Sequence, residues 1–300
     1  MNRADVSVTM LVRDGEADLR ALHPFLATLA SVTIGDDGSN DNTVALCARE
    51  GWTCVDVSHL ATFALKRDYV ISRSPKGWLL WLDCDERPQD DFLAQLQSLE
   101  SDPRLVAGYE VRLRLFFAGR PLSYGGTTYR ATRLFHSSAY RGFVGQIHER
   151  LILEGRVAHS KLQLDHYSYA STHHYVTKIN RYTDDEAAEL REKAEVVLFP
   201  PVRRWCAAVG RATYLLAWKR NRSHARVYAK QTLKNRHVVV ILVPLYPVAR
   251  FFSVYLFRLG ILDGWEGLKF AILSAMYSIL KYVKFFERRN RVSEDIVGDD

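Results

Sequence analysis

Apolar and polar residues alternate along the first hundred positions with two different periods. Residues 6–12 alternate apolar with polar side chains and end at the Asp14-Gly15 turn, which is typical of a strand. Between Leu19 and Leu29 the apolar side chains recur at helical spacing instead. The two patterns then repeat and predict strands at 31–35, 53–57 and 78–82, with helices at 40–49 and 63–74. Strands that alternate with helices predict an α/β fold with a parallel, doubly wound sheet.

The last third of the chain has apolar runs in place of this alternation. Residues 238–249 and 251–257 are strongly apolar, but Pro244, Pro247 and Arg250 interrupt them. A helix that crosses a bilayer needs roughly 20 apolar residues. We therefore do not expect a membrane span in this region.

Charge is distributed unevenly along the sequence. The 300 residues carry a net charge of +7, yet residues 196–292 contain 18 Lys and Arg against 3 Asp and Glu, so the remainder is acidic. A cationic, apolar segment that is too interrupted to span can lie on an anionic membrane surface. A pair of core helices with solvated basic edges is the alternative interpretation. Nucleic acid is not the expected partner, because long apolar runs suit a bilayer better than phosphates.

Composition and cysteine spacing exclude several classes of protein. With 48% hydrophobic and 25% charged residues, the chain is globular rather than disordered, collagenous or coiled-coil. Its four cysteines have no Cys-x-x-Cys or zinc-ligand spacing, so we expect a reducing compartment. The first 20 residues are too rich in charge for a secretory signal. The predicted location is the cytoplasmic face of the inner (plasma) membrane, with peripheral attachment.

Acidic residues follow two of the predicted strands. Asp36 and Asp37 end the second strand, and Asp83, Asp85 and Glu86 come directly after the fourth. Ligands of an open α/β sheet bind beyond the carboxyl ends of its strands. Carboxylates at i and i+2 there can hold Mg²⁺ or Mn²⁺, which retains water and shares substrate phosphates. The alternative is a solvated turn that caps the next helix.

The histidines do not form a recognisable zinc site. His148, His159 and His166 lack the i, i+4 or Cys/His spacing of zinc ligands. We expect them to be hydrogen-bonded residues.

Eight motifs follow one another in a characteristic order. Strand 6–12, the segment 36–43 and the run Leu82-Asp83-Cys84-Asp85-Glu86 come first. The later ones are Arg133-Leu134-Phe135, Ile147-His148-Glu149, Asp165-His166-Tyr167-Ser168-Tyr169, and the segments 175–182 and 260–267. Together they resemble the family 2 glycosyltransferases of the GT-A fold, and within that family the lipopolysaccharide inner-core β-glucosyltransferases, over residues 5–288.

The resemblance implies a division of the chain. It predicts a GT-A type, Rossmann-like mixed sheet flanked by helices over residues 1–170, the catalytic domain. Its nucleotide-sugar half would be residues 1–105 and its acceptor half 106–170. Residues 171–300 would form a helical, basic C-terminal region that associates with the membrane.

The resemblance also implies how the nucleotide-sugar donor is bound. Asp36 and Asp37 would contact the nucleotide base and ribose, and the backbone from Leu11 to Arg13 would line the same pocket. Arg67 would contact the diphosphate; an exposed helix cation is the alternative.

The same resemblance implies that two further carboxylates form a metal site. Asp83 and Asp85 would form the metal and diphosphate site. Asp85 would be the main ligand of Mg²⁺ or Mn²⁺, and Asp83 would lie nearer the ribose.

Glu149 is the expected general base. An inverting transfer needs one carboxylate on the acceptor face to take the proton of the attacking hydroxyl. A retaining double displacement would also need a nucleophile, and no residue is singled out for that. In an extended segment only one of His148 and Glu149 points into the cleft, and we prefer Glu149. A surface glutamate paired with Arg150 or Arg133 is the alternative.

These expectations combine into one hypothesis and two competitors. The hypothesis is a metal-dependent inverting hexosyltransferase that moves a hexose, expected to be glucose from a UDP-linked donor, to a lipopolysaccharide-core or other lipid-linked acceptor. The first competitor is a glycosyltransferase of the same fold acting on a polyprenyl phosphate or a capsule or exopolysaccharide intermediate. The second is a non-catalytic membrane-bound scaffold.

Overall fold

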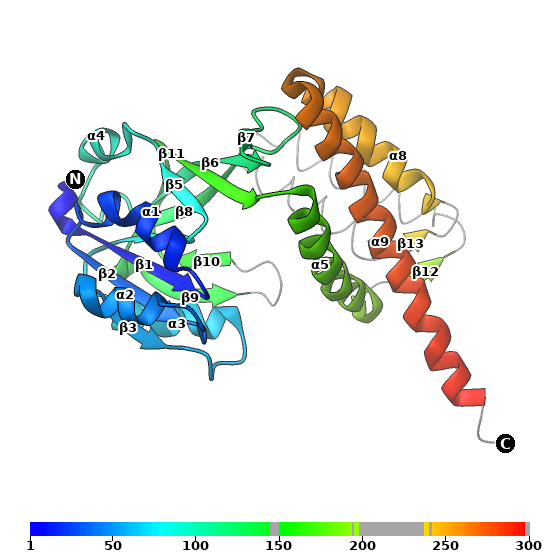
Figure 1. Ribbon diagram of the computed structural model, residues 1–300, viewed down its shortest axis with the longest axis horizontal. Coiled ribbons are helices and arrows are strands. Elements are labelled where there is room, and N and C mark those ends of the chain that lie inside the picture. The colour runs from blue at the N-terminus through cyan, green and yellow to red at the C-terminus, as the bar shows by residue number, and fades with distance from the viewer. Residues whose placement is uncertain (145–149, 194, 198–236, 240–241, 298–300) are drawn as a thin grey trace. The chain divides into compact units, whose positions relative to one another are not determined.

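The chain divides into two compact units, Met1–Ala170 and Ser171–Asp300 (Figure 1). The computed structural model describes residues 1–144, 150–193, 195–197, 237–239 and 242–297. Each unit is described below by itself.

A mixed β-sheet forms the centre of the first unit. Its strands are β1 (Val6–Val12), β2 (Ser31–Asp36), β3 (Thr53–Asp56), β4 (Trp78–Trp81), β5 (Glu86–Pro88), β6 (Gly108–Phe117), β7 (Arg120–Pro121), β8 (Tyr129–His136) and β11 (Val157–Tyr169). They lie in the order β3-β2-β1-β4-β8-β6-β11-β5, with β7 paired to β6. The first four in this order are parallel, whereas β8 runs antiparallel to both of its neighbours and β5 antiparallel to β11. A separate hairpin pairs β9 (Tyr140–Val144) with β10 (Arg150–Leu153).

Helices cover both faces of this sheet. They are α1 (Glu16–Leu26), α2 (Thr43–Glu50), α3 (Phe63–Arg73) and α4 (Phe92–Gln97), with short 3₁₀ turns η1 (Arg3–Asp5) and η2 (Ser137–Ala139). Leu80 of β4 packs in a core cluster with side chains of α1, α2 and α4, whereas Leu79 packs with Ile71 of α3. Successive residues of a strand point to opposite faces, so β4 must be apolar on both. This explains the continuous apolar run of residues 78–82.

The predictions for the first 82 residues are confirmed. Each predicted strand and helix is present, and the four parallel strands form the predicted sheet. The antiparallel strands β8 and β5 make the sheet mixed, as the GT-A resemblance implies. Glu86 does not cap a helix but begins β5, because its backbone pairs with His166 of β11.

The second unit is mainly helical. It contains α5 (Thr172–Lys193), a parallel pair of short strands β12 (Glu195–Val197) and β13 (His237–Val239), α8 (Leu245–Phe252), the π-helical turn η4 (Ser253–Phe257), the 3₁₀ turn η5 (Gly260–Asp263) and α9 (Gly264–Val297). Ala187 of α5 and Phe285 of α9 are buried together. Lys284 of α9 is 2.9 Å from Asp184 of α5, so apolar packing and charge both join these helices.

The membrane-span expectation was tested on the described residues. No single helix among them is long and apolar enough to cross a bilayer. Leu245–Phe257 and Gly260–Glu287, bent by 72° relative to each other, reach that length and composition only as a pair.

Candidate functional site

The acidic residues singled out above lie at one edge of the sheet. Val12 pairs with Asp36 in the β1–β2 register, and Thr9 pairs with Trp81 between β1 and β4. The three strands are parallel, so their carboxyl ends point the same way. Asp36 and the carboxylates that follow β4 therefore share the edge at which α/β sheets bind ligands.

The loops after β1 and β2 are joined by hydrogen bonds. The Asp14 amide donates to Ser39 Oγ at 2.9 Å, and the Asn40 amide donates to Asp14 Oδ1 at 2.7 Å. The Glu16 amide, in the first turn of α1, donates to Asp41 Oδ2 at 2.9 Å. A carboxylate at a helix N-terminus is favoured by the unpaired amides and the helix dipole. The two loops are thus joined to each other by hydrogen bonds at this edge of the sheet.

Asp36 and Asp37 differ in their surroundings. Asp36 is buried, and its Oδ2 accepts a hydrogen bond from the Ser39 amide at 3.2 Å. Its Oδ1 is buried without a hydrogen-bond partner among the described residues. Asp37 instead forms an ion pair with Lys66 of α3. An unpaired buried acceptor is costly, so Asp36 is the residue of this pair that a ligand donor would satisfy.

Leu11 and Arg13 diverge at the end of β1. The Leu11 side chain packs beside Trp81 in the cluster on the α3 face of the sheet. The Arg13 side chain is exposed, with its Nε 3.9 Å from Asp14 Oδ2. The side chains therefore do not line one pocket together, and only the backbone remains for the predicted role.

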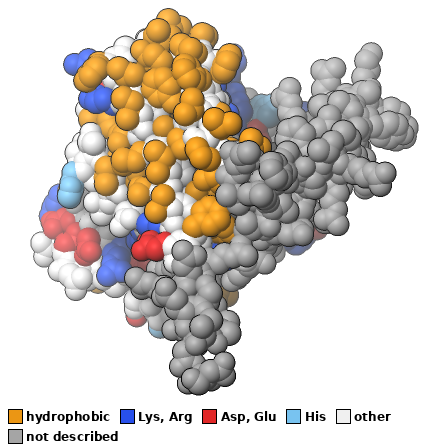
Figure 2. All heavy atoms as spheres, turned by 90° about the vertical axis from the view of Figure 1, so that its right-hand side faces the viewer, with side chains coloured by type: hydrophobic (Ala, Val, Ile, Leu, Met, Phe, Trp, Pro, Cys, Tyr) orange, Lys and Arg blue, Asp and Glu red, His pale blue; other side chains and the backbone are white. Residues whose placement is uncertain are grey.

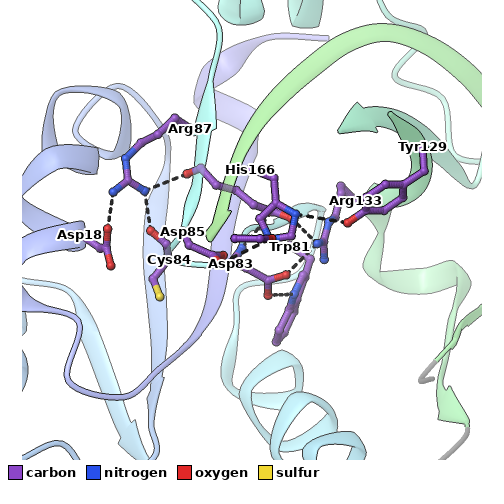
Figure 3. A network of polar contacts seen from close by, with 11 residues as sticks. Asp18, Trp81, Asp83, Cys84, Asp85, Arg87, Tyr129, Arg133 and His166 are labelled. Atoms are coloured by element: carbon purple, nitrogen blue, oxygen red, sulfur yellow. Dashed lines mark hydrogen bonds and ion pairs between the residues drawn. The ribbon is translucent and has the colours of Figure 1, made fainter. Parts of the chain in front are cut away.

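Asp83 lies in a buried cluster that sequence reasoning did not foresee (Figure 3). Arg133 Nη2 donates to Asp83 Oδ2 at 2.7 Å and also to Glu86 Oε1. Trp81 Nε1 donates to Asp83 Oδ1 at 3.0 Å, and the Asp83 amide donates to Glu86 Oε2 at 3.1 Å. Glu86 has no exposed surface at all. One guanidinium thus serves two carboxylates inside the protein.

The shared cation separates the pKa values of the two carboxyls. Burial alone would raise the pKa of Asp83, but the charges of Arg133 and Arg67 outweigh it and lower that pKa to about 2. For Glu86, burial and the charge of Asp83 outweigh Arg133 and raise the pKa to about 7. Asp83 is therefore ionised at neutral pH, and Glu86 is the carboxyl of the cluster that takes up a proton as the pH falls.

Asp85 pairs with a histidine on a distant strand. Its Oδ2 lies 3.4 Å from His166 Nε2, and the same nitrogen is 2.6 Å from Ser168 Oγ. His166 Nδ1 faces the Tyr129 hydroxyl at 3.4 Å. Burial opposes protonation of His166, but Asp85 and the neighbouring carboxylates outweigh it and raise its pKa. The expectation that His166 is hydrogen-bonded is confirmed.

Arg67 is near Asp83 but stacked between aromatic rings. Its guanidinium carbon lies 5.1 Å from the centre of the Trp81 ring and 5.2 Å from that of Phe143. Its charge also contributes to the low pKa of Asp83. Cation–π stacking of this kind fixes an arginine in place. Arg67 is therefore not a freely exposed helix cation.

Hydrogen bonds from two sides fix the loop that carries Asp85. Arg87 donates to the backbone carbonyl of Cys84 and to the carboxylate of Asp18 on α1 (Figure 3). The Tyr167 amide donates to the Asp85 carbonyl at 2.8 Å. The loop is held from α1 on one side and from β11 on the other, so the Asp85 carboxylate has a defined position.

The donor set fits a divalent cation at Asp85 better than at Asp83. Both Asp83 oxygens already accept hydrogen bonds, from Arg133 and Trp81. Among the described residues no group of three His, Cys, Asp or Glu side chains is placed to enclose an ion. Mg²⁺ and Mn²⁺ need only one or two protein ligands when substrate phosphates and water supply the rest. Asp85 and His166 are the two side chains that could supply them.

Glu149 lies outside the described residues, but the strands on either side of it are described. Phe143 of β9 lies 5.8 Å from the Trp81 ring, and Leu151 of β10 packs in the same cluster. The Phe143 amide donates to Asp68 Oδ1 at 3.2 Å, and the Tyr140 hydroxyl donates to the same oxygen. The hairpin is thereby attached to α3 and β4.

Sequence reasoning missed the partners of the acidic residues. Arg133, considered above only as a surface partner of Glu149, is buried and bonded to Asp83 and Glu86. It lies 50 residues from Asp83 along the chain. The sequence signal that could have indicated its burial was its place in the Arg133-Leu134-Phe135 motif, where a cation directly precedes two core residues.

Removal of Arg133 is expected to destabilise the fold strongly. Arg133→Ala leaves the fully buried Glu86 and the partly exposed Asp83 without their shared cation, and breaking a buried ion pair typically costs about 3–5 kcal/mol of unfolding free energy. Urea unfolding followed by circular dichroism measures the change. Arg104→Ala is the control, because Arg104 pairs with Asp102 at the surface and should change little. Equal losses in the two variants would contradict the assigned burial of Arg133.

The raised pKa of Glu86 predicts a stability that falls as the pH rises. Its folded-state pKa of about 7 exceeds the ordinary value of 4.5, so the folded state holds the proton more tightly. The contribution is full below pH 4.5 and is lost as the pH rises through about 7, on the order of 3 kcal/mol in all. Unfolding in EDTA at pH 5.5 and 8 should show this loss in the wild type and a smaller one in Glu86→Gln. Glu154→Gln, at an exposed carboxylate, should behave as the wild type; an unchanged slope in Glu86→Gln would refute the assignment.

Comparison with known proteins gives similarities but no family. No known family model matches the chain. A TPR repeat-containing protein of Synechococcus elongatus is 28% identical over 148 residues, 49% of this chain and 35% of that protein, so the match spans about a third of that relative.

Two solved structures are similar at low scores. Glucosyl-3-phosphoglycerate synthase from Mycobacterium tuberculosis, in complex with Mn²⁺, UDP and glucosyl-3-phosphoglycerate, is 14% identical over 37% of this chain and 43% of that one, with a TM-score of 0.29. TarS from S. aureus is 11% identical over 94% of this chain and 90% of that one, with a TM-score of 0.38.

Proposed function

We propose that the protein is a metal-dependent, inverting glycosyltransferase that uses a nucleotide-sugar donor. The observation that carries this proposal is the grouping of Asp85 and His166 beside the Asp83–Arg133 pair, at the same sheet edge as Asp36. A diphosphate leaving group needs positive charge, and a nucleoside needs hydrogen-bond acceptors. This edge offers both.

The donor would lie across the ends of β2, β1 and β4. The Asp36 Oδ1 that has no described partner would accept from the base or ribose, next to Asp37 and the backbone of residues 11–13. Asp83, fixed by Trp81 and Arg133, would face the ribose. Arg67 would add positive charge beside the diphosphate. We assign UDP-linked hexose, with glucose preferred, as the donor.

A divalent cation, Mn²⁺ or Mg²⁺, would be held by Asp85 and His166. When bound, it supplies positive charge that stabilises the departing nucleoside diphosphate. His166 must lose its proton to become a ligand through the Nε2 atom that faces Asp85, and the Tyr129 hydroxyl, which faces Nδ1, would then hold the ring. Mg²⁺ demands hard oxygen ligands in near-ideal octahedral geometry, so with an imidazole ligand Mn²⁺ is the expected preference.

Glu149 would act as the general base. It lies between β9 and β10, whose side chains pack against Trp81, and Trp81 itself is bonded to Asp83. The described strands on either side of it thus lie beside the proposed donor site, which supports the proposal. One base, with no protein nucleophile, corresponds to inversion at the anomeric carbon.

The acceptor would be a lipopolysaccharide core or another lipid-linked glycan, met at the cytoplasmic face of the plasma membrane. The exposed apolar surface of the second unit supports a membrane location. A polyprenyl phosphate or a capsule or exopolysaccharide intermediate is the second candidate acceptor. A non-catalytic scaffold would bind nucleotide without turnover.

Hydrolysis and transfer assays with a panel of nucleotide sugars test the proposal. The purified protein is incubated with UDP-glucose, other UDP-hexoses and GDP- or ADP-sugars, with Mn²⁺, Mg²⁺ or EDTA, and release of nucleoside diphosphate is measured. We expect release from a UDP-hexose with Mn²⁺ and none with EDTA. Nucleotide binding without release from any donor, in the presence of lipid-linked acceptors, would favour the scaffold instead.

A further inference from the structure

The segment that joins α8 to α9, residues 256–265, exposes large apolar side chains. We call this segment the elbow. Its exposed apolar residues are Leu256, Phe257, Leu259, Ile261, Leu262 and Trp265. Phe257 is 84% exposed and Trp265 68%, whereas a soluble surface seldom gathers side chains of this size in ten consecutive positions.

The elbow is built to hold this shape. Leu259 adopts the left-handed conformation with φ 60°, which is unfavourable for leucine. A Cβ on Gly267 would meet the Gly260 carbonyl oxygen at 1.9 Å, so α9 packs directly on the backbone of the turn. The strained backbone and the close packing of α9 therefore keep the Leu259 side chain exposed to solvent. An element that served only as a connection would bury this side chain or replace it.

The apolar surface continues from the elbow along both helices. Figure 2 shows hydrophobic side chains gathered on this face of the molecule. The exposed ones on the two helices are Leu245, Val248, Phe252, Ile272, Ile279 and Val283. Phe251 and Tyr255 are less exposed and stack on each other, with ring centres 5.4 Å apart. The face therefore has its own packed base beneath the exposed side chains.

The charges around the elbow suit an anionic bilayer. Between residues 245 and 265 the charged side chains are Arg250 and Arg258, which are both exposed, and Asp263, which is half-buried, so the basic charges outnumber the acidic one. Glu266, on the first turn of α9, is neutralised by Lys269 at 2.6 Å. Arginines beside large apolar groups and a tryptophan are typical of segments that enter the headgroup region of a membrane.

The helices on either side of the elbow indicate that it enters one leaflet of a membrane and does not cross the bilayer. Leu245–Phe257 is bent from the next helix by 72° and is roughly 20 Å long at the helical rise, against about 30 Å of hydrocarbon. On the other arm, Lys281 and Lys284 pair with Glu186 and Asp184 of α5. That end of α9 is paired with α5 and stays outside the membrane. The chain must therefore leave the bilayer on the side from which it entered.

We propose that the elbow inserts into one leaflet of an anionic membrane as a monotopic anchor, with Phe257, Leu262 and Trp265 among the acyl chains and Arg250 and Arg258 at the phosphates. The occupant of this face is thus lipid rather than a partner protein. The inference rests on the proposed function in one respect, since an acceptor carried by a lipid must be met at the bilayer. It assigns the membrane contact to ten residues of the basic region.

Vesicle flotation of the full-length protein tests the anchor. With vesicles of phosphatidylcholine and phosphatidylglycerol, Phe257→Ser/Leu262→Ser should lower the partition coefficient about tenfold or more, because two buried apolar side chains are lost. Leu105→Ser, which removes an equally exposed leucine of the first unit, should leave it unchanged. High salt should reduce wild-type binding only in part. Equal binding of the double variant and the wild type would overturn the proposal.

Fluorescence gives a readout that does not depend on the double variant folding. Lipids brominated on the acyl chain should quench a component of wild-type tryptophan emission that is absent in Trp265→Phe. If the quenched component is the same in Trp265→Phe as in the wild type, the elbow does not enter the bilayer. The same conclusion would follow if the protein bound purified protein partners but not vesicles. UDP-hexose hydrolysis without vesicles should be normal in all these variants, so loss of hydrolysis in the wild type would refute the enzyme and not the anchor.

Discussion

Asp85→Ala is expected to abolish sugar transfer while leaving the fold intact. The substitution removes the carboxylate that would hold the cation with His166, and Asp83 cannot replace it, because both of its oxygens are bonded to Trp81 and Arg133. The leaving diphosphate would then lack its main counter-charge. Transfer, measured as UDP release with acceptor present, should fall to background. Circular dichroism and the unfolding midpoint should remain close to wild type, because Asp85 is partly exposed.

Asp90→Ala is the matched control, because Asp90 is an exposed acid five residues further on. It should keep full activity. The wild type in EDTA should behave like Asp85→Ala, and only the wild type should recover when Mn²⁺ is added. Activity that survives both EDTA and Asp85→Ala would remove the metal from the proposed reaction.

The local part of the fold could be predicted from sequence. The run of residues 78–82 is apolar at every position because both faces of β4 are covered, and its periodicity shows this directly. The turn of residues 36–39 marks the end of β2 in the same way. These signals lie within a few residues of the elements that they specify.

The partners of the site residues could not be predicted in this way. Arg133 reaches Asp83 from β8, and His166 reaches Asp85 from β11, across more than 45 residues of chain. Nothing in the spacing of a single sequence encodes which distant strand lies beside β4 or β5. Glu86 shows the consequence, since the alternative interpretation made it part of a helix-capping turn, whereas it is a fully buried member of a strand. The roles assigned to the site residues remain predictions, namely those of Leu11, Arg13, Asp36, Asp37, Arg67, Asp83, Asp85 and Glu149.

Glu149→Gln is expected to preserve donor binding and to lose turnover. Glutamine has the shape of glutamate but cannot accept the proton of the acceptor hydroxyl. Removal of a general base typically lowers the rate by about 10²- to 10⁴-fold. Calorimetry with UDP and Mn²⁺ should give wild-type affinity, and single-turnover transfer from a UDP-hexose should give the reduced rate.

The hairpin around Glu149 offers a control for this experiment. Glu154 follows β10 and pairs with Arg141 at the surface, so Glu154→Gln changes a carboxylate of the same hairpin without touching the proposed chemistry. It should keep the wild-type rate. A general base also predicts that external formate or azide rescues a smaller variant, Glu149→Ala, whereas a residue that only positions the donor is not rescued. If donor affinity collapsed in Glu149→Gln and the rate per bound donor stayed normal, Glu149 would belong to the nucleotide site and the base would have to be sought elsewhere on the acceptor face.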